Sequence, residues 1–252
     1  MRRRTGWWRT TSSKSPKVSS GTDTELDEAQ AEWRRRFVAG PTRLRWNQLP
    51  PQVGDEAPDI ELLDPDGHPT RLSTFWDDTP ALLLFWRHNG CTCGFDRAQR
   101  LKDEYESYEA TGAHVVVVGQ AEPTRAKAYA AANSLPCPVL CDPEYLAYQA
   151  FGLREGDLSQ VIYNAPEQYW TTDLDVWSGV LQERRELGRP LVDNPWQLPG
   201  EFVVAAGGTL KLAHHYNHCE DYPDPRVLLS ALRSTHHRSV TGRSQPHRNA
   251  PG

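Results

Sequence analysis

The stretch from residue 81 to residue 101 constrains the fold of this chain more than any other part of its sequence. It opens with an apolar run, residues 81–86, that no polar residue interrupts, which is typical of a strand buried on both faces. A glycine and two closely spaced cysteines, Cys91 and Cys93, come next. A helical pattern then follows, in which apolar residues recur at spacings of three and four: Phe95, Ala98, Leu101 and Tyr105. The stretch therefore predicts a strand, a sharp turn that carries a cysteine, and a helix.

The place of Cys91 in this pattern has a chemical meaning. Unpaired N–H groups and the positive end of a helix dipole stabilise a thiolate, which is the reactive form of cysteine. Arg87 or His88 would add further positive charge close to the turn. We interpret Cys91 as a redox-active cysteine at a helix N-terminus. The alternative is an inert buried thiol, because free cysteines are commonly buried.

Composition narrows the classes of protein to which the chain can belong. A net charge of −5 is mild and gives no sign of a nucleic-acid partner. No apolar run approaches the roughly 18–20 residues that span a bilayer, so no membrane association is expected. The charged opening at residues 1–9 lacks the apolar segment of an export signal. Five irregularly spaced cysteines argue against a secreted disulfide scaffold and favour a cytoplasmic location.

The sequence divides into one large domain with additional segments at its ends. Residues 1–23 are a basic tail without periodicity and residues 234–252 are polar, so both are predicted to be disordered. Residues 24–48 predict a peripheral helix and a linker. Apolar runs cluster in residues 49–233, where strand and helix patterns alternate as in an α/β fold. Residues 153–198 are interpreted as a helical insert over the sheet.

Four motifs occur in a defined order within the large domain. They are VGDEAP at 53–58 before a predicted hairpin, FWRHNGC at 85–91, PVLCDP at 138–143, and QLPGEFV at 197–203 followed by a Gly-Gly turn. In this order they resemble the peroxiredoxin-like AhpC/TSA proteins of the thioredoxin-fold superfamily, also called the redoxin domain. The resemblance covers about residues 50–233. It implies a thioredoxin-like three-layer α/β/α sandwich with a mixed central sheet, an N-terminal β-hairpin and a helical insert before the last two strands.

The resemblance also implies a function. It predicts a thiol-dependent antioxidant oxidoreductase, either a thiol peroxidase or a disulfide oxidoreductase, that reduces peroxides or protein disulfides through Cys91. No organic cofactor is implied, because the electrons pass through thiols. A thioredoxin-like protein or a low-molecular-weight thiol would act as reductant, and a homodimer is left open. The peroxiredoxin pattern Pro-x-x-x-Thr-x-x-Cys has no counterpart before Cys91, so the oxidant stays undecided between a peroxide and a disulfide.

The expected topology names the neighbours of Cys91. The strand around Phe202 should run antiparallel to the 81–86 strand and begin at the edge where Cys91 lies. Pro199 would then face Cys91 and resemble the family's cis-proline. The next strand should end at the same edge and bring Cys219 there, with three histidines: His214, His215 and His218. Cys141 follows a parallel strand and is expected on this side as well.

Roles follow for the residues at this edge. Cys93 or Cys219 is the predicted resolving thiol, which would condense with an oxidised Cys91 to a disulfide. A Cys-x-Cys disulfide closes a tight ring and is expected to be strained and easily reduced. Trp86, Gly90 and Pro199 are candidates for substrate binding, although a tryptophan at position 86 is also suited to core packing.

Two other classes of function stay open. Cys91 and Cys93 together with His218 and Cys219 offer soft ligands suited to zinc or Cu(I), although the spacing is not that of a zinc ribbon or finger. Alternatively, the chain is a catalytically silent thioredoxin-fold module that binds a partner through the Trp- and Pro-rich segment 163–198.

Overall fold

A computed structural model of the chain describes residues 23–42 and 49–235. The tails predicted at residues 1–23 and 234–252, and the end of the predicted linker, lie almost wholly outside these residues.

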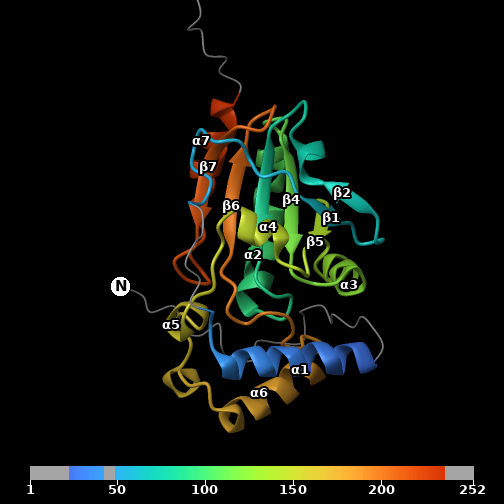
Figure 1. Cartoon of the computed structure of the whole chain (residues 1–252), viewed down its shortest axis with the longest axis vertical. Coiled ribbons are helices and arrows are strands. Elements are labelled where there is room, and N and C mark those ends of the chain that lie inside the picture. The colour runs from blue at the N-terminus through green and yellow to red at the C-terminus, as the bar shows by residue number, and fades with distance from the viewer. Residues whose placement is uncertain (1–22, 43–48, 236–252) are drawn as a thin grey trace, which may run out of the picture.

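The described residues form one mixed seven-stranded sheet, with the strand order β2-β1-β5-β4-β3-β6-β7 (Figure 1). Strand β3 runs parallel to β4, and β4 runs parallel to β5. Strand β6 runs antiparallel to β3, with Gly200 opposite Phe85, so β6 begins at the edge where β3 ends. This confirms the predicted topology. The strand bounds are β1 Glu61–Leu63, β2 Pro69–Arg71, β3 Ala81–Phe85, β4 His114–Gly119, β5 Val139–Cys141, β6 Gly200–Val204 and β7 Leu210–His215.

Helices cover both faces of this sheet. Their bounds are α1 Asp23–Ala39, α2 Thr92–Glu109, α3 Pro123–Asn133, α4 Leu146–Ala150, α5 Leu158–Val161, α6 Leu174–Glu186 and α7 Pro225–Ser234, with short 3₁₀ helices η1 Leu72–Phe75 and η2 Glu167–Tyr169. None of the helices in the described part of the chain has the length and apolar character needed to cross a membrane.

The unbroken apolar run of β3 has a simple explanation, because its two faces belong to two different cores. Leu82 and Leu84 pack with residues of α2, α3 and α7. Leu83 and Phe85 point to the opposite face and pack with α4 and η1. Successive side chains of a strand alternate between faces, so a strand with helices on both sides needs apolar residues throughout. The three-layer α/β/α sandwich predicted from the resemblance is therefore confirmed.

The additional elements are also those expected. The hairpin β1–β2 pairs Leu62 with Thr70. The insert contributes α5, η2 and α6 between β5 and β6. Helices α1 and α6 lie side by side across the end of the sheet (Figure 1). An aromatic cluster joins them, in which the ring of Phe37 lies 5.0 Å from that of Trp177 and stacks on Trp196 at 5.3 Å. The two helices and this aromatic cluster lie at the edge of the sheet where Cys91 is found.

Candidate functional site

Cys91 occupies the N-cap of helix α2, directly after the turn that follows β3. Its N–H donates to the carbonyl of His88 at 3.0 Å, and its own carbonyl accepts from the N–H groups of Gly94 and Phe95. The N–H groups of the first turn of a helix lack partners within the helix and favour negative charge. The predicted strand, turn and helix are confirmed, and the sulfur of Cys91 lies where a thiolate is stabilised.

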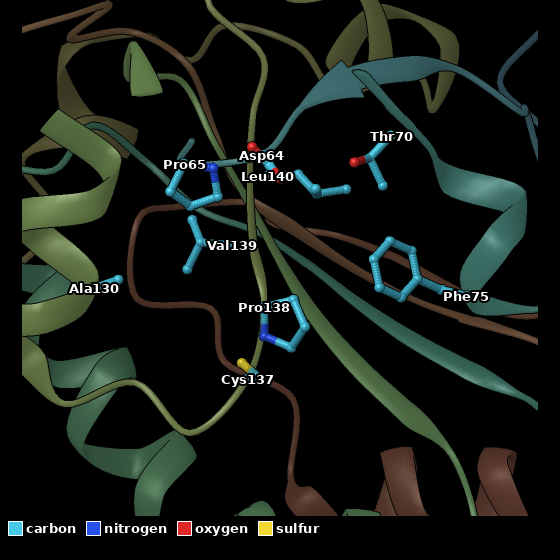
Figure 2. A pocket seen from close by; sticks show the side chains of 9 residues that line it. All are labelled: Asp64, Pro65, Thr70, Phe75, Ala130, Cys137, Pro138, Val139 and Leu140. Carbon is cyan, nitrogen blue, oxygen red and sulfur yellow. The ribbon is translucent and has the colours of Figure 1, made fainter. Parts of the chain in front are cut away.

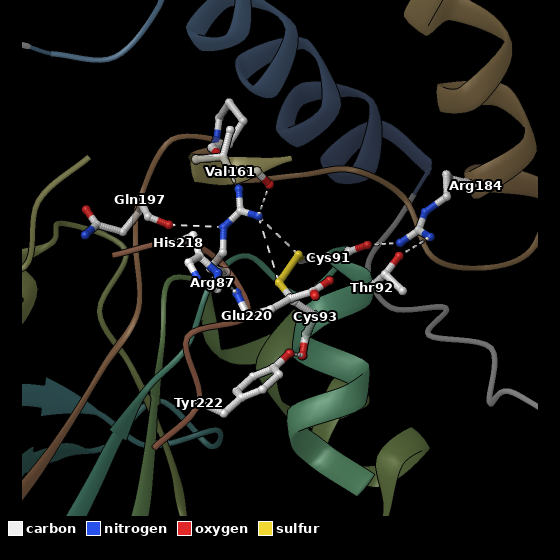
Figure 3. The surroundings of a disulfide bond; sticks show 12 residues. Arg87, Cys91, Thr92, Cys93, Val161, Arg184, Gln197, His218, Glu220 and Tyr222 are labelled. Carbon is white, nitrogen blue, oxygen red and sulfur yellow. Dashed lines mark hydrogen bonds between the residues drawn. A yellow bond between two sulfur atoms is a disulfide. The ribbon is translucent and has the colours of Figure 1, made fainter. Parts of the chain in front are cut away.

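A disulfide joins Cys91 to Cys93, with 5.3 Å between their Cα atoms (Figure 3). Cys93 is one of the two partners expected from the sequence. The bond is nearly hidden, because Cys91 is 9% exposed and Cys93 is 6% exposed. A macromolecule therefore finds little sulfur surface to approach, whereas a small molecule needs only a narrow opening.

The guanidinium of Arg87 lies directly beside the two sulfurs (Figure 3). Its Nη1 donates to Sγ of Cys91 at 3.3 Å and lies 3.9 Å from Sγ of Cys93. The same group donates to three carbonyls: Val161 at 2.9 Å, Gln197 at 3.2 Å and Pro195. Arg87 is 5% exposed and forms no ion pair within the described ranges. It thus supplies the positive charge expected next to Cys91, and it also ties the insert to the sulfurs.

Cys219 completes a cluster of three sulfur-bearing residues with Cys91 and Cys93. Its N–H donates to the carbonyl of Gln160 at 2.9 Å, which fixes the segment after β7 against α5. Tyr222 packs on this cluster, and its hydroxyl donates to the carbonyl of Cys93 at 2.9 Å. Burial raises the pKa of the Cys219 thiol, and the charge of Arg87 opposes that rise. The predicted approach of Cys219 to Cys91 is confirmed.

Cys141 lies at the expected edge of the sheet, because β5 runs parallel to β4 and β3 and Cys141 is its last residue. Its sulfur nevertheless stays outside the cluster of Cys91, Cys93 and Cys219, since β4 lies between β5 and β3. It packs in the core formed with α2 and α3 and lies 3.9 Å from the carbonyl oxygen of Asp64 in the hairpin. The two histidines of β7 bond to backbone carbonyls: Nε2 of His214 pairs with the carbonyl of Asp221, and Nε2 of His215 with that of Phe151.

Of the two residues expected to add positive charge, Arg87 does so and His88 does not. The side chain of His88 is 4% exposed. Burial lowers its pKa well below 6.5, and the nearby charges of Arg87 and Arg184 lower it further. The imidazole is therefore neutral at neutral pH, because the interior and two neighbouring cations both oppose a second charge.

The three residues predicted to bind substrate have different surroundings. Trp86 is 4% exposed and packs edge-on against Tyr129 at 6.1 Å, so it belongs to the core. Gly90 is buried, and a side chain there would collide with the carbonyl of Pro190. Pro199 is not a cis-proline, since no peptide bond in the described ranges is cis. Its carbonyl accepts the N–H of Tyr216 at 3.2 Å, which extends the ladder between β6 and β7 in the trans form.

Sequence reasoning missed Arg184, which lies on the insert helix α6. Its guanidinium donates to Oγ1 of Thr92 at 3.1 Å and to the carbonyl of Gly90, so it holds both residues that flank Cys91 (Figure 3). An arginine within a charged helix carries no local signal of such a contact. A buried ion pair was missed as well: Nε of Arg97 donates to Glu201 at 2.7 Å. The sequence does carry a signal for this pair, because Glu201 is a charged residue within the apolar run of β6.

A separate cleft of about 410 Å³ lies between β5, η1 and α3 (Figure 2). Its lining includes the free thiol of Cys137. Burial raises the pKa of this thiol to about 12, so it stays protonated and unreactive at neutral pH. Within the part of the chain that the structure describes, no group of three or more His, Cys, Asp or Glu side chains is arranged to hold a metal ion.

The chain is similar to known proteins in its sequence. A model of the AhpC/TSA family matches residues 53–212. The thioredoxin-like protein AAED1, chloroplastic, of Arabidopsis thaliana is 26% identical over 104 residues, which make up 41% of this chain and 42% of that protein. The match thus spans less than half of this relative's length.

Solved structures share the fold at low sequence identity. The peroxidoxin BcpB of Mycobacterium tuberculosis is 19% identical, with a TM-score of 0.50 over 73% of this chain and 97% of that one. The thiol peroxidase of Chromobacterium violaceum is 14% identical, with a TM-score of 0.50 over 74% of this chain and 88% of that one. These likenesses support the thioredoxin-like fold found above.

Proposed function

The chain belongs to the AhpC/TSA family, and we propose that it is a thiol-dependent oxidoreductase that reduces a peroxide or a disulfide through Cys91. One observation carries the proposal. Cys91 is the N-cap of helix α2, receives a hydrogen bond from the buried guanidinium of Arg87, and is bonded to a second cysteine two residues away. Positive charge and a helix N-terminus both lower the pKa of a thiol, and the neighbouring thiol provides the partner for a disulfide.

The proposed reduction of a peroxide proceeds in two steps. The Cys91 thiolate attacks one peroxide oxygen, the O–O bond breaks, and the departing oxygen leaves as an alcohol or water after protonation. Cys91 is then a sulfenic acid, with which the Cys93 thiol condenses to form the disulfide and release water. With a disulfide substrate, Cys91 instead forms a mixed disulfide and Cys93 displaces the second substrate thiol. Both routes leave the Cys91–Cys93 bond found in the structure.

Two external thiols complete the cycle. One attacks the disulfide to form a mixed disulfide, and the second releases it, so the protein regains two thiols and the external thiols leave as a disulfide. A cycle of this kind needs a reducing compartment, and the proposal therefore keeps the cytoplasmic location expected from the sequence.

Cys219 is the alternative resolving thiol in this proposal. It lies in the same cluster and next to the same guanidinium. Condensation of Cys219 with an oxidised Cys91 would leave Cys93 as a free thiol. Burial raises the pKa of the Cys219 thiol even beside Arg87, which lowers the fraction of its reactive thiolate at neutral pH.

Intact-mass analysis with peptide mapping tests the proposal. The reduced, metal-free protein is treated with one equivalent of hydrogen peroxide or of a small disulfide. Rapid loss of two hydrogens with a Cys91–Cys93 bond is the expected result, and a Cys91–Cys219 bond would identify the other resolver. If Cys91 reacts with neither oxidant, the chain is not an oxidoreductase of this type, and the silent interaction module becomes the better hypothesis.

A further inference from the structure

A free thiol lies beside the Cys91–Cys93 disulfide. All five cysteines belong to the described part of the chain, and three of them are free: Cys137, Cys141 and Cys219. Only Cys219 packs in one buried cluster with the two bonded cysteines. Cys137 lines the separate cleft, and Cys141 ends a strand that β4 separates from β3. One thiol and one disulfide therefore share the same site.

The segment that carries Cys219 is fixed to the insert. The N–H of Cys219 donates to the carbonyl of Gln160 at 2.9 Å, and Nε2 of Gln160 donates to the carbonyl of Asn217 at 2.7 Å. The ring of His218 stacks on that of Tyr163 at 3.7 Å. These contacts hold Cys219 and the two residues before it, so the thiol has a defined place in the cluster.

The same segment is fixed to α2 at Cys93. The hydroxyl of Tyr222, three positions after Cys219, donates to the carbonyl of Cys93 at 2.9 Å (Figure 3). The guanidinium of Arg100, also on α2, lies 4.8 Å from the centre of the Tyr222 ring. Tyr222 itself packs on the sulfur cluster. The chain around Cys219 is therefore anchored to Cys93, the second cysteine of the disulfide.

The two sulfurs of the disulfide differ in how readily they leave. Nη1 of Arg87 lies 3.3 Å from Sγ of Cys91 and 3.9 Å from Sγ of Cys93. Cys91 is also the N-cap of α2. In thiol–disulfide exchange, the sulfur whose thiolate is better stabilised is the better leaving group. A thiolate that attacks Cys93 displaces Cys91 and so has the more favourable leaving group.

We propose that Cys219 is a third catalytic cysteine, which attacks Sγ of Cys93 and takes over the disulfide from Cys91. The inference rests on the proposed function and adds a step to it. The Cys219 thiol loses its proton to solvent, and its sulfur forms a bond with Sγ of Cys93. The bond between Cys93 and Cys91 breaks, and Cys91 leaves as a thiolate beside Arg87. One disulfide and one thiol are present before and after the step, so it needs no external oxidant or reductant.

The environment of Cys219 makes this transfer the later step. Burial raises the pKa of the Cys219 thiol, so only a small fraction is thiolate at neutral pH. The Cys91–Cys93 bond found in the structure therefore forms first, and its transfer follows. Because the attacking and the attacked sulfur belong to one cluster, their fixed positions compensate for the small thiolate fraction.

The transfer returns Cys91 to its reduced form before an external thiol acts. The disulfide then joins Cys93 to Cys219 and ties α2 to the segment after β7. This role differs from that of a resolving thiol. A resolving Cys219 would be bonded to Cys91 and would leave Cys93 free, whereas the transfer leaves Cys91 free. The three possible bonds within the cluster can therefore be told apart by the cysteine that stays unbonded.

Disulfide mapping of the oxidised protein tests the transfer. The reduced protein is oxidised with one equivalent of diamide, samples are quenched in acid at increasing times, and free thiols are alkylated with N-ethylmaleimide after denaturation. Trypsin then yields one peptide, residues 88–97, with both Cys91 and Cys93, and another, residues 212–226, with Cys219. We expect the first peptide to appear initially with an internal disulfide. At later times it should be linked to the second peptide and carry the label on Cys91.

The other free cysteines provide controls for random exchange. We expect the link to Cys219 to be about tenfold more abundant than the links to Cys137 and Cys141 together, because only a thiol held beside the disulfide has a high effective concentration. In Cys219→Ser the linked species should be lost, and the peptide 88–97 should keep its internal disulfide. Cys141→Ser removes a similarly buried thiol outside the cluster and should behave like wild type. Thermal melting of both variants verifies that they are folded.

Three results would overturn the inference while leaving the proposed function intact. They are a Cys91–Cys93 bond that persists with the label on Cys219, a bond from Cys219 to Cys91 with the label on Cys93, and a link to Cys219 that is no more abundant than those to the other free cysteines. If Cys91 carries the label in Cys219→Ser as well, Cys91 does not form a disulfide, and the proposed function itself fails.

Discussion

The Nη1 atom of Arg87 lies 3.3 Å from Sγ of Cys91, and the same side chain donates to the carbonyls of Val161 and Pro195, which both belong to the insert. One residue thus connects the chemistry of the sulfur to the position of the elements above it. The connection works in both directions. A change in the charge on the sulfur changes the electrostatic interaction between the sulfur and the guanidinium. A shift of the insert moves the carbonyls to which the guanidinium donates, and so changes its distance from the sulfur.

Replacement of Arg87 tests its effect on the Cys91 thiolate. In Arg87→Gln the positive charge beside the sulfur is lost, so the pKa of the reduced Cys91 thiol should rise by about one unit or more. The pH midpoint for alkylation of Cys91 by iodoacetamide should move upward accordingly, and Arg87→Lys should restore part of the shift. Arg226→Gln, which removes an exposed arginine paired with Asp224, is the matched control. An unchanged midpoint in Arg87→Gln would show that the charge does not reach the sulfur.

The cysteines should differ sharply in their contribution to turnover. Cys91→Ser is expected to abolish thiol-dependent reduction of peroxide or disulfide. Cys137→Ser should leave it nearly intact, because burial keeps the pKa of that thiol at about 12 and Cys137 lines a different cleft. Steady-state rates of both variants give the comparison. Equal loss in the two would contradict the assignment of Cys91.

His88 should make the protein sensitive to acid. The pKa of His88 in the folded state lies well below 6.5, the value expected in the unfolded chain. As the pH falls below about 6.5, His88 is therefore protonated in the unfolded chain while it stays neutral in the folded protein. The stability that the neutral ring provides is present above about pH 6.5 and is lost as the pH falls below that value, by up to about 1.4 kcal/mol per pH unit.

The experiment is urea unfolding of wild type and His88→Gln from pH 7 to pH 4.5. The free energy of unfolding of the variant should fall less steeply with decreasing pH below about 6.5. If the free energy of unfolding of wild type and of His88→Gln changed equally with pH, His88 would not be the cause of the acid sensitivity.

The close approach at Gly90 should be sensitive to a single methyl group. In Gly90→Ala the new Cβ would collide with the Pro190 carbonyl and lie 3.1 Å from Cα of Leu191, and both neighbours are backbone. We expect a loss of about 1–3 kcal/mol in the free energy of unfolding, since backbone must shift to make room. The displaced loop should also expose the disulfide, so that dithiothreitol reduces it faster.

Gly179→Ala is the matched control for that substitution. Gly179 lies within α6 and has nothing within 4 Å of the position that a Cβ would take. Alanine there should stabilise the helix by about 0.5–1 kcal/mol and leave the rate of disulfide reduction unchanged. If the two variants had similar effects on stability and on the rate of disulfide reduction, the close contact between Gly90 and Pro190 would not be what keeps the loop over the disulfide.

The central elements could be predicted because their signals are local. A run of apolar residues such as 81–86 needs burial on both faces, and the spacing of Phe95 and Leu101 fits one side of a helix. Cys91 lies between these two patterns, so its place at the N-cap of α2 followed from the sequence. The antiparallel run of β6 beside β3 followed from the resemblance and placed Cys219 correctly.

The errors arose where a residue's role depends on distant neighbours. Cys141 ends β5 at the expected edge, but β4 separates β5 from β3, so the shared edge does not bring its thiol into the sulfur cluster. The pKa of His88 is lowered by burial, by its neighbour Arg87 and by Arg184, almost a hundred positions away, and the burial and the contribution of Arg184 come from the tertiary structure. Pro199 comes directly before β6 as expected, but the peptide bond that precedes it is trans.

The sequence by itself determined the order of strands and helices and the cysteine at which they meet, because periodicity and turn residues act over a few positions. Only the tertiary structure decided what surrounds that cysteine. The acceptors of Arg87 lie at the start of α2, in α5 and in the loop before β6, and Arg184 and Arg189 belong to the insert. Electrostatic and hydrogen-bonding partners are selected by distance in space, and no local pattern encodes that distance.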